Sequence, residues 1–367
     1  PDVVHVSSLI EGLGDDVVTS IGQFFPPDRT VVTLYDLIPY LEQEQYLTSD
    51  ALRGHYFRKI GEMRKAGSLL AISEYTRKEA IEEGGFSSSA IFNISSAVDP
   101  EFGPRKVGEE RKNEVLARFG IEREFTLYTG SFDSRKNHKR LIEAFSLLST
   151  DVQLSNQLVI VGNGWEGVYL ELGRYAQCLG IRDGGIVFTG RVSDSELLDL
   201  YALCKVFVFP SLREGFGLPV LEAMSMGTPT IGSSTTSVAE VLGIQEAMFD
   251  PYNVDEIAIK LQRALTDSDF RNLLSKHGLA HSKKFSWHAS ASKALAVIES
   301  MFSEDGNQAI STSASRKVYK ENSYERLLDS VRNLAGSSAV SDDFLLQCAE
   351  SIIVNRTLSE AKYYAHC

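Results

Sequence analysis

Two glutamates, Glu214 and Glu222, flank a short segment, Gly215–Pro219, that contains two glycines. The segment follows an apolar stretch, and the pattern predicts a helix that starts near Leu218 with a proline in its first turn. The free N–H groups at a helix start bind anions such as a diphosphate, and glycine lets the backbone approach a ligand closely. Two carboxylates cannot both point at phosphate, so we expect them to accept hydrogen bonds from the hydroxyl groups of a ribose and a sugar.

Each glutamate has a simpler interpretation when it is taken alone. Glu222 is expected in the first helical turn, where the helix dipole stabilises a carboxylate whether or not it binds a ligand. Glu214 alone is typical of a solvated loop charge. Because both occur around one glycine turn, the sequence favours a binding site. The helix is expected to stop at Gly227, which precedes Thr228 and Pro229.

Short apolar runs that alternate with amphipathic stretches must position this turn. The runs are continuous rather than alternating in polarity, which is typical of parallel strands covered by helices on both faces. The predicted strands are Val3–Val6, Val31–Tyr35, Ser68–Ile72, Thr126–Thr129, Leu158–Val161, Ile186–Thr189 and Lys205–Phe209. The pattern predicts an α/β protein, and ligands of such folds bind outside the carboxyl ends of the strands.

Composition excludes several functional classes. The 367 residues carry 37 lysines and arginines against 49 aspartates and glutamates, and an acidic chain argues against nucleic-acid binding. The 43% hydrophobic and 23% charged content is that of a soluble globular protein. No apolar run approaches the roughly 20 residues of a membrane-spanning helix. The cysteines lack C-x-x-C spacing, so we expect no metal site and a reducing compartment.

Two changes in composition divide the chain. Residues 99–112 contain two prolines, a glycine and a run of charges, which favours a linker. Near residue 303 the strand–helix rhythm gives way to a serine-rich stretch. We therefore expect a first α/β domain that is incomplete at its start, a second α/β domain, a connecting helix and a helical extension, at residues 1–105, 106–285, 286–303 and 304–367.

The seven residues between Glu214 and Glu222 make a pattern that closely resembles the E-x7-E motif of the retaining glycosyltransferases of family four (glycosyl transferases group 1), which have the GT-B fold. The resemblance covers most of residues 1–303. Further similar segments are Leu127–Gly130, Arg135–Asn137, Val161–Gly164, Phe188–Val192, Phe249–Pro251 and Phe285–Trp287. Val31–Pro39 and Ile72–Arg77 resemble the mannosyltransferase branch, which includes bacterial enzymes that build polymannose O-antigen chains.

The resemblance implies two facing Rossmann-like domains, the first for an acceptor and the second for a nucleotide-sugar donor. Residues 286–303 would cross back onto the first domain. The implied reaction moves a hexose, α-mannose from GDP-mannose, with retention of configuration and without a metal or another cofactor. The implied acceptor is a growing saccharide or a lipid-linked oligosaccharide. The implied location is the cytoplasm, including a peripheral position at the inner face of the membrane.

The resemblance also implies roles for particular residues. Lys136 would neutralise the donor diphosphate, and Glu222 would hold the ribose hydroxyls. Glu214 would position the sugar together with the backbone of Phe216 and Gly217. The leaving phosphate would then accept the proton of the acceptor hydroxyl as that hydroxyl attacks from the same face.

Three further positions complete the predicted substrate-binding set. Gly215 and Leu218 belong to the turn and the helix start, and the backbone near Val192 would select the nucleotide base. Asp36 would orient the acceptor or the transferred sugar, with a helix cap as the alternative.

Two positions depart from the family pattern. Ser131 stands where the family commonly has an arginine that binds the diphosphate, and Arg135 nearby is expected to be a solvated loop charge. Tyr35 stands where many relatives carry a histidine. The glycine-rich loop that follows the first strand in the family is missing.

Two weaker signals concern the second domain. Gly162–Gly167 matches the G-x-G-x-x-G pattern of a dinucleotide site, with Asp183 about 20 residues further on. That acidic residue should end the next strand, whereas Asp183 precedes the predicted strand at Ile186–Thr189, so we do not expect NAD binding. His138 follows the lysine loop, and a lone loop histidine is more commonly exposed than bound to phosphate.

Several alternatives stay open at this point. The donor could be a UDP- or ADP-linked hexose, and Ser131 and Tyr35 favour a catalytically silent sugar-nucleotide-binding module of a larger protein. A non-hydrolysing sugar-nucleotide epimerase shares the GT-B fold. The apolar stripe of Leu327, Leu328, Val331 and Leu334 either packs on the main body or connects to further domains or partner subunits.

Overall fold

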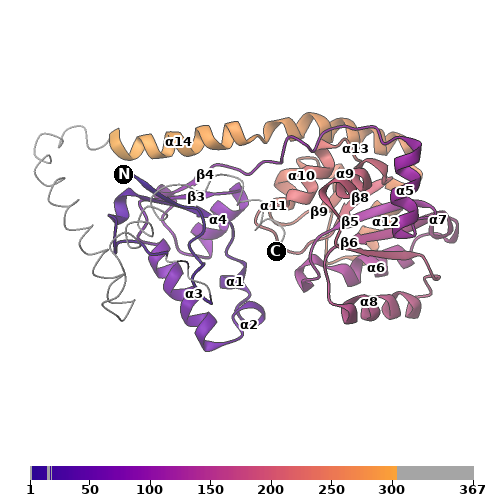
Figure 1. Cartoon of the computed structure of the whole chain (residues 1–367), viewed down its shortest axis with the longest axis horizontal. Coiled ribbons are helices and arrows are strands. Elements are labelled where there is room, and N and C mark those ends of the chain that lie inside the picture. Colours follow the sequence, from indigo (N-terminus) through magenta and orange to yellow (C-terminus); the bar gives the residue numbers. More distant parts are fainter. Residues whose placement is uncertain (1, 15–16, 18, 304–367) are drawn as a thin grey trace, which may run out of the picture. The chain divides into compact units, whose positions relative to one another are not determined.

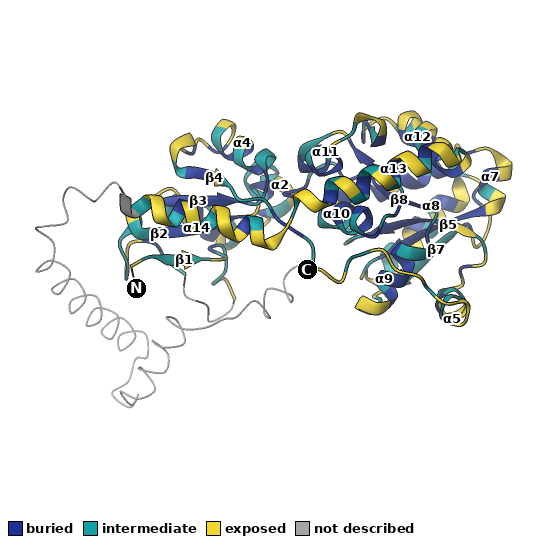
Figure 2. Ribbon diagram, turned by 90° about the horizontal axis from the view of Figure 1, so that it is seen from above, coloured by how far each residue is buried: buried dark blue, intermediate teal, exposed yellow. Residues whose placement is uncertain are grey.

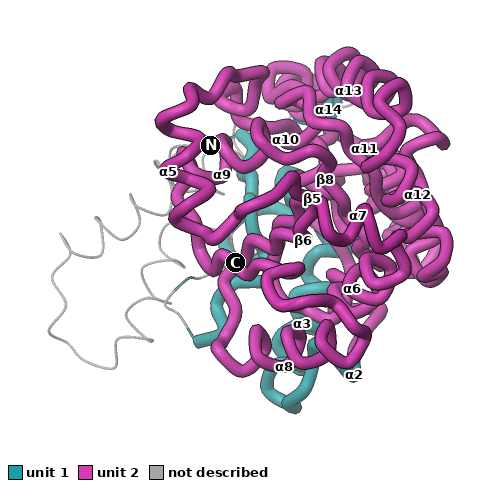
Figure 3. Tube along the Cα trace, turned by 90° about the vertical axis from the view of Figure 1, so that its right-hand side faces the viewer, with its two compact units in different colours: residues 1–33, 44–70, 295–367 teal, residues 34–43, 71–294 magenta. Residues whose placement is uncertain are grey.

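The computed structural model describes residues 2–14, 17 and 19–303. The described chain divides into two compact units (Figure 3), one within residues 1–33, 44–70 and 295–303 and the other within residues 34–43 and 71–294. The predicted extension at 304–367, with its apolar stripe, lies outside the described residues. The predicted domain boundaries stay predictions.

The first sheet has four strands in the order β1-β2-β3-β4. They are β1 (Val4–Val6), β2 (Thr30–Leu34), β3 (Ser68–Ala71) and β4 (Ile91–Asn93). β1 and β2 are parallel, with Val4 opposite Thr30. The helical segments of this part of the chain (Figure 1) are η1 (Pro27–Arg29), α1 (Ile38–Leu41), α2 (Gln43–Tyr46), α3 (Asp50–Met63), α4 (Glu74–Glu82) and η2 (Ser88–Ala90).

The second sheet has six strands in the order β10-β9-β8-β5-β6-β7, and each strand is parallel to its neighbours. They are β5 (Glu124–Thr129), β6 (Asn156–Val161), β7 (Ile186–Gly190), β8 (Val206–Phe209), β9 (Thr230–Ser233) and β10 (Met248–Phe249). The helical segments are α5 (Glu109–Phe119), η3 (Ser134–Lys136), α6 (His138–Ser146), α7 (Thr150–Ser155), α8 (Glu166–Cys178), α9 (Asp194–Leu203), α10 (Leu218–Ser225), α11 (Thr236–Leu242), η4 (Gln245–Ala247), α12 (Val254–Thr266), α13 (Ser268–His281), η5 (Ser282–Lys284) and α14 (Trp287–Ser303).

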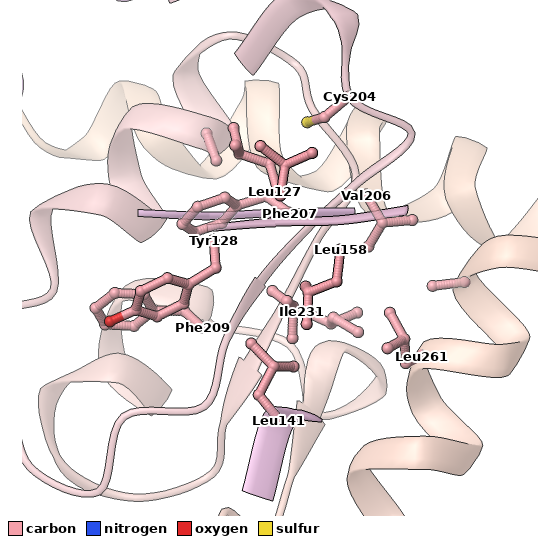
Figure 4. Packing of buried hydrophobic residues seen from close by; sticks show 14 of the residues in the cluster. Leu127, Tyr128, Leu141, Leu158, Cys204, Val206, Phe207, Phe209, Ile231 and Leu261 are labelled. Atoms are coloured by element: carbon pink, nitrogen blue, oxygen red, sulfur yellow. The ribbon is translucent and has the colours of Figure 1, made fainter. Parts of the chain in front are cut away.

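The core of the second sheet is formed by side chains on both of its faces. Leu127 and Tyr128 are neighbours in β5 and therefore point to opposite faces, yet both are fully buried. Phe207 and Phe209 of β8 are also fully buried and pack near them (Figure 4). Figure 2 shows the central strands buried and the outer faces of the helices exposed. Burial on both faces explains why the strand sequences are continuously apolar.

The strands predicted from the sequence are all present, with ends that differ by one or two residues. Three further strands, β4, β9 and β10, carry no clear sequence signal. β9 contains a threonine, a glycine and a serine among its four residues, and β10 has two residues. Pairing with a parallel neighbour, rather than local apolarity, makes these segments strands.

The parallel arrangement places the loops after β5, β6, β7 and β8 at one edge of the sheet. These loops contain residues 130–133, 162–165, 191–193 and 210–217. Because ligands of open α/β sheets bind outside the carboxyl ends of the strands, this edge is where the predicted site residues of the second domain belong.

Helix α9 offers a local test of the fold, because it begins with a reciprocal capping box. Ser193 Oγ accepts from the Glu196 N–H at 3.3 Å, and the Glu196 carboxylate accepts from the Ser193 N–H at 2.9 Å. We expect Ser193→Ala to lower the free energy of unfolding by about 1 kcal/mol, measured by urea denaturation. Ser87→Ala, at the exposed start of η2 where no side-chain cap bond forms, is the control. An equal loss in both variants contradicts the capping role.

Candidate active site

The strand–turn–helix unit predicted around the two glutamates is present. β8 ends at Phe209, and α10 begins at Leu218 with Pro219 in its first turn. Gly217 precedes the helix with a φ of 94°, a conformation that favours glycine. Gly227, also with a positive φ, follows the helix as predicted. At the start of α10, Pro219 has no N–H, and the Val220 and Leu221 N–H groups donate to the Gly217 carbonyl oxygen at 3.0 and 3.4 Å. Among the described residues, the Leu218 N–H is the first-turn amide of α10 without such a bond.

Glu214 is the centre of a buried cluster of charges. Its Oε1 accepts hydrogen bonds from Lys136 Nζ and from Ser211 Oγ, each at 2.6 Å. Its Oε2 accepts a hydrogen bond from Arg135 Nη1 at 3.0 Å. The residue is only 8% exposed, so the interpretation of Glu214 as a solvated loop charge is wrong.

The cations decide the ionisation of this carboxylate. Burial alone raises the pKa of Glu214, because water no longer stabilises the charge. The charges of Lys136 and Arg135, with the hydrogen bonds from Lys136 and Ser211, outweigh burial and hold the pKa below its usual value. Glu214 is therefore ionised at neutral pH. Asp133 Oδ2 also lies 3.8 Å from Arg135 Nε, so the two cations meet two carboxylates and these four side chains carry no surplus of positive charge.

Asn137 fixes the loop that brings Lys136 to Glu214, although the two residues are 78 positions apart in the sequence. Asn137 has a φ of 64°, which turns the chain sharply between η3 and α6. Its side-chain amide donates to the carbonyl oxygens of Pro210 at 3.0 Å and Pro251 at 2.8 Å. These bonds tie the loop after β5 to the loop after β8, and this connection brings the cation to the carboxylate.

Gly215 is a glycine because other backbone passes close to it. A Cβ at this position would lie 2.4 Å from the carbonyl oxygen of Tyr35 and 3.1 Å from the Cβ of Asp36. The Gly215 carbonyl accepts hydrogen bonds from Ser73 Oγ at 2.7 Å and from Thr76 Oγ1 at 3.0 Å, both at the start of α4. These contacts hold the start of the turn that leads into α10.

Asp36 lies beside the charged cluster. Its Oδ1 accepts from the Ile38 N–H at 2.9 Å, which is the local bond of a helix cap. Burial raises the pKa of Asp36, while the Ile38 bond and the charges of Arg135 and Lys136 lower it. The structure thus supports the cap and also places this carboxylate within electrostatic reach of the cluster. Its contact with a substrate stays a prediction.

Glu222 lies in the second turn of α10 rather than the first, so its expected position is wrong. No acidic residue occupies the first turn, and the helix dipole does not explain Glu222. Its Oε2 accepts a hydrogen bond from the Tyr201 hydroxyl at 2.8 Å. Burial raises the pKa of Glu222 to about 7. The sequence does not predict the contact with Tyr201, because it forms only where α9 packs beside α10.

Arg135 is not the solvated loop charge that the sequence predicts. Its side chain is only 20% exposed, and its Nη1 also donates to the Arg213 carbonyl oxygen at 3.0 Å. The single turn of η3 presents neighbouring residues 135 and 136 to the same carboxylate.

His138 is also placed differently from its prediction. As the first residue of α6 it is 6% exposed, with its ring stacked on Phe132 at 4.8 Å between centroids and edge-on to Tyr128 at 4.7 Å. Burial and the nearby Lys136 lower the pKa of His138 to about 4. The imidazole is therefore neutral at pH 7 and part of the packed layer beneath the lysine loop.

The remaining predicted residues are distributed along the same edge. Phe216 is buried, with its ring edge-on to Phe285 at 5.7 Å. Leu218 is the first residue of α10 and is partly buried, as is Val192 between β7 and α9. The contacts of these residues with a substrate stay predictions.

The glycine pattern after β6 is hydrogen-bonded through its backbone to a tyrosine in the following helix. Tyr169 Oη accepts from the Gly164 N–H at 2.6 Å and donates to the Gly162 carbonyl at 2.9 Å. Asp183, after α8, accepts from the Gln177 side chain at 3.1 Å. The Gly164 amide that a pyrophosphate would need is already bonded, which supports the expectation that this is no dinucleotide site.

The described residues contain neither a cluster of metal ligands nor a membrane-spanning helix. No cluster of three or more histidine, cysteine, aspartate or glutamate side chains is arranged to hold a metal ion in the described ranges. Among the helices that the structure describes, none has both the length and the apolar character needed to cross a membrane.

The protein has two parallel sheets that are covered by helices, which is the architecture of a GT-B fold. The charged cluster lies beyond the carboxyl edge of the larger sheet. The structure is similar to that of WaaG, a glycosyltransferase involved in lipopolysaccharide biosynthesis, with a TM-score of 0.63 and 18% identity over 81% of this chain and 78% of that chain. This similarity confirms the predicted fold class.

The chain belongs to the glycosyl transferases group 1 family, whose profile matches residues 112–281. It is 39% identical over 320 residues to the serotype-specific mannosyltransferase WbdA of Escherichia coli, which is 86% of this chain and 39% of that protein. It is 34% identical to O-antigen chain mannosyltransferase B of Escherichia coli over 71% of this chain and 67% of that protein. The chain thus spans about two fifths of the length of the WbdA relative.

The Lys136–Glu214 pair leads to a stability prediction. Lys136→Met leaves a buried carboxylate with one cation fewer, so we expect the free energy of unfolding to fall by about 3 kcal/mol. Adding Glu214→Gln to the same chain should recover part of this loss, measured as a double-mutant cycle in urea. The control is Lys139→Met, whose partner Glu171 forms an exposed pair with side-chain exposures of 60% and 54%. Its expected loss is below about 1 kcal/mol, and equal losses at both lysines contradict the prediction.

The same pair predicts a response to acid. Because the pKa of Glu214 is lower in the folded state, its stabilisation is present above the unfolded-state pKa of about 4.3. That stabilisation is lost as the pH falls further, through the lower folded-state pKa. Urea unfolding between pH 6 and pH 3 should show a steeper loss for the native chain than for Glu214→Gln. Parallel curves for the two proteins contradict this assignment.

Proposed function

We propose that the chain is a retaining glycosyltransferase that moves α-mannose from GDP-mannose onto a growing saccharide or a lipid-linked acceptor in bacterial O-antigen synthesis. Membership of the glycosyl transferases group 1 family supports the reaction class. The two Escherichia coli relatives, a mannosyltransferase and an O-antigen chain mannosyltransferase, support the sugar and the pathway.

One observation carries the proposal: Glu214 is held ionised between Lys136 and Arg135 beside the start of α10. An ammonium group has three N–H donors, so Lys136 keeps donors for a phosphate after it has bonded to Glu214. The Leu218 N–H at the start of α10 is a further donor at the same edge. The diphosphate of a nucleotide sugar matches this combination of cations and helix N-terminus.

The proposed reaction is that of a retaining glycosyltransferase, with these donors at the leaving group. The bond between the anomeric carbon and the diphosphate oxygen breaks, and the departing GDP takes the electron pair. Lys136 and the Leu218 N–H stabilise the negative charge that develops on that oxygen. The acceptor hydroxyl attacks from the same face, its proton passes to the departing phosphate, and the α-configuration is retained.

Glu214 acts in this scheme as a hydrogen-bond acceptor. Its low pKa makes it a poor proton donor, and its bonds to Lys136, Ser211 and Arg135 make it a poor nucleophile. Its carboxylate retains lone pairs that can accept from the hydroxyl groups of the sugar. We propose that it orients the sugar together with the backbone amides of Phe216 and Gly217.

The other predicted residues complete the proposed site. Glu222 would accept hydrogen bonds from the ribose hydroxyls, and the backbone near Val192 would contact the base. Asp36 would orient the acceptor or the transferred sugar. We propose that no metal ion is needed at the diphosphate, where Lys136 supplies a cation.

The cellular setting belongs to the same proposal. A nucleotide-sugar donor and a lipid-linked acceptor would meet at the cytoplasmic face of the membrane, where the protein would be peripheral. Because the chain matches only 39% of the WbdA relative's length, residues 304–367 are proposed to connect to further domains or partner subunits.

The nucleotide is identified by thermal-shift measurements with GDP, UDP and ADP and with their mannose or glucose conjugates. A ligand that binds only the folded protein raises the melting temperature, so GDP and GDP-mannose should give the largest rise. A larger rise with UDP or ADP overturns the choice of donor but not of reaction class. No rise with any of the three contradicts a nucleotide-sugar site.

Catalysis is tested by GDP release from GDP-mannose, first without and then with a mannose-containing oligosaccharide. The native chain should release GDP slowly by hydrolysis, and Glu214→Ala should reduce the rate by about 100-fold or more, as expected when a group that positions the reacting sugar is lost. Glu171→Ala, which alters an exposed glutamate on α8, should leave the rate unchanged. GDP binding without any turnover supports the silent module, and an epimerised nucleotide sugar supports the epimerase.

A further inference from the structure

Tyr201 links three elements of the donor-side sheet through its hydroxyl group. It lies in the last turn of α9, with its Oη 2.8 Å from Glu222 Oε2 on α10. The same oxygen lies 3.0 Å from Thr129 Oγ1, at the end of β5. No sequence motif singles out this tyrosine, and the reaction scheme does not yet use it.

The direction of these hydrogen bonds follows from the chemistry of the groups. An ionised carboxylate only accepts, so Tyr201 donates its single hydroxyl proton to Glu222. Thr129 must then donate to Tyr201. Within the described part of the chain, Glu222 Oε1 has no hydrogen-bond partner, so one carboxylate oxygen is held by the protein and the other is available.

The tyrosine ring is fixed on all sides. Tyr201 is fully buried, and its ring contacts those of Phe207 at 5.4 Å and Phe102 at 6.1 Å between centroids. Its carbonyl oxygen accepts from Thr228 Oγ1 at 2.7 Å. A side chain packed in this way has no alternative rotamer, so its hydroxyl is a fixed point against which Glu222 is oriented.

We propose that Tyr201 is a positioning residue for nucleotide binding: it holds Glu222 through Oε2 so that Oε1 is presented to the vicinal hydroxyl groups of a ribose. This inference rests on the proposed function, because it assigns the ribose of the donor to Glu222. Tyr201 itself does not touch the ligand and acts through the carboxylate.

The protonation of Glu222 gives this role a measurable signature. Burial raises the pKa of Glu222 to about 7, and the Tyr201 hydrogen bond is the opposing influence. Burial also raises the pKa values of Tyr201 and of the neighbouring Cys204, so both stay neutral. Helices α11 and α13 also pack on α10, but no charged group of the described residues counteracts burial at Glu222. Loss of the tyrosine hydroxyl should therefore favour the protonated form, which accepts ribose hydroxyls less well.

The test is calorimetric binding of GDP and of inorganic pyrophosphate between pH 6 and pH 9. For Tyr201→Phe, the pH at which GDP affinity is half-lost should rise by about one unit, since a hydrogen bond to a charged group is removed. GDP affinity at pH 7 should fall by about fivefold, as the ionised fraction of Glu222 falls, with KM for GDP-mannose raised and kcat nearly unchanged. Pyrophosphate, which lacks a ribose, should bind the variant and the native chain equally.

Two further variants make the result specific. Thr129→Val removes the donor behind Tyr201 at nearly constant volume, and we expect a smaller shift of the GDP profile in the same direction. Tyr175→Phe is the matched control, because it removes another tyrosine hydroxyl that donates to a carboxylate, that of Glu143 on α6. Its GDP profile should coincide with that of the native chain.

Three results would overturn the inference. An unchanged GDP affinity and pH profile in Tyr201→Phe shows that Glu222 needs no such support. Equal losses of GDP and pyrophosphate binding show a general structural defect instead of a role at the ribose. A native chain that binds pyrophosphate but not GDP refutes the ribose assignment, whereas a native chain that binds neither refutes the proposed function itself.

Discussion

The structure around the candidate site depends on one constraint, the burial of the Glu214 carboxylate between two cations. Removing an ion from water costs several kcal/mol, and the cost is offset only where partners are placed with good geometry. Lys136, Arg135 and Ser211 meet this requirement, with hydrogen bonds of 2.6 to 3.0 Å. In the proposed function, the diphosphate would share Lys136 with this carboxylate.

The surrounding fold keeps these partners in place. β5 and β8 are adjacent and parallel, so the loop that carries the cations and the loop that carries the carboxylate leave the sheet side by side. Asn137 joins the two loops through backbone carbonyls. Gly215 allows close approach of the Tyr35 backbone. Each of these features fixes backbone rather than contacting a ligand, which is how a rigid scaffold supports a site at its loops.

The two glutamates of the motif share a residue type and differ in environment. Glu214 faces cations, which keep its pKa low in spite of burial. Glu222 faces a neutral tyrosine, and burial raises its pKa to about 7. Two buried carboxyl groups on one strand–turn–helix unit thus differ in protonation: Glu214 stays ionised at neutral pH, and Glu222 has a pKa of about 7. Environment, not residue identity, separates their roles.

The sequence by itself determined the α/β class, most strand positions, the start and end of α10 and the residues of the motif. These follow from local signals, namely apolar runs, a proline, glycines and the spacing of two glutamates. Tertiary structure alone decided the burial of Arg135 and His138, the turn of α10 that holds Glu222, and its contact with Tyr201. Those features depend on side chains that meet across tens of residues, and on the exclusion of water where they meet. Neither is encoded in any short stretch of the chain.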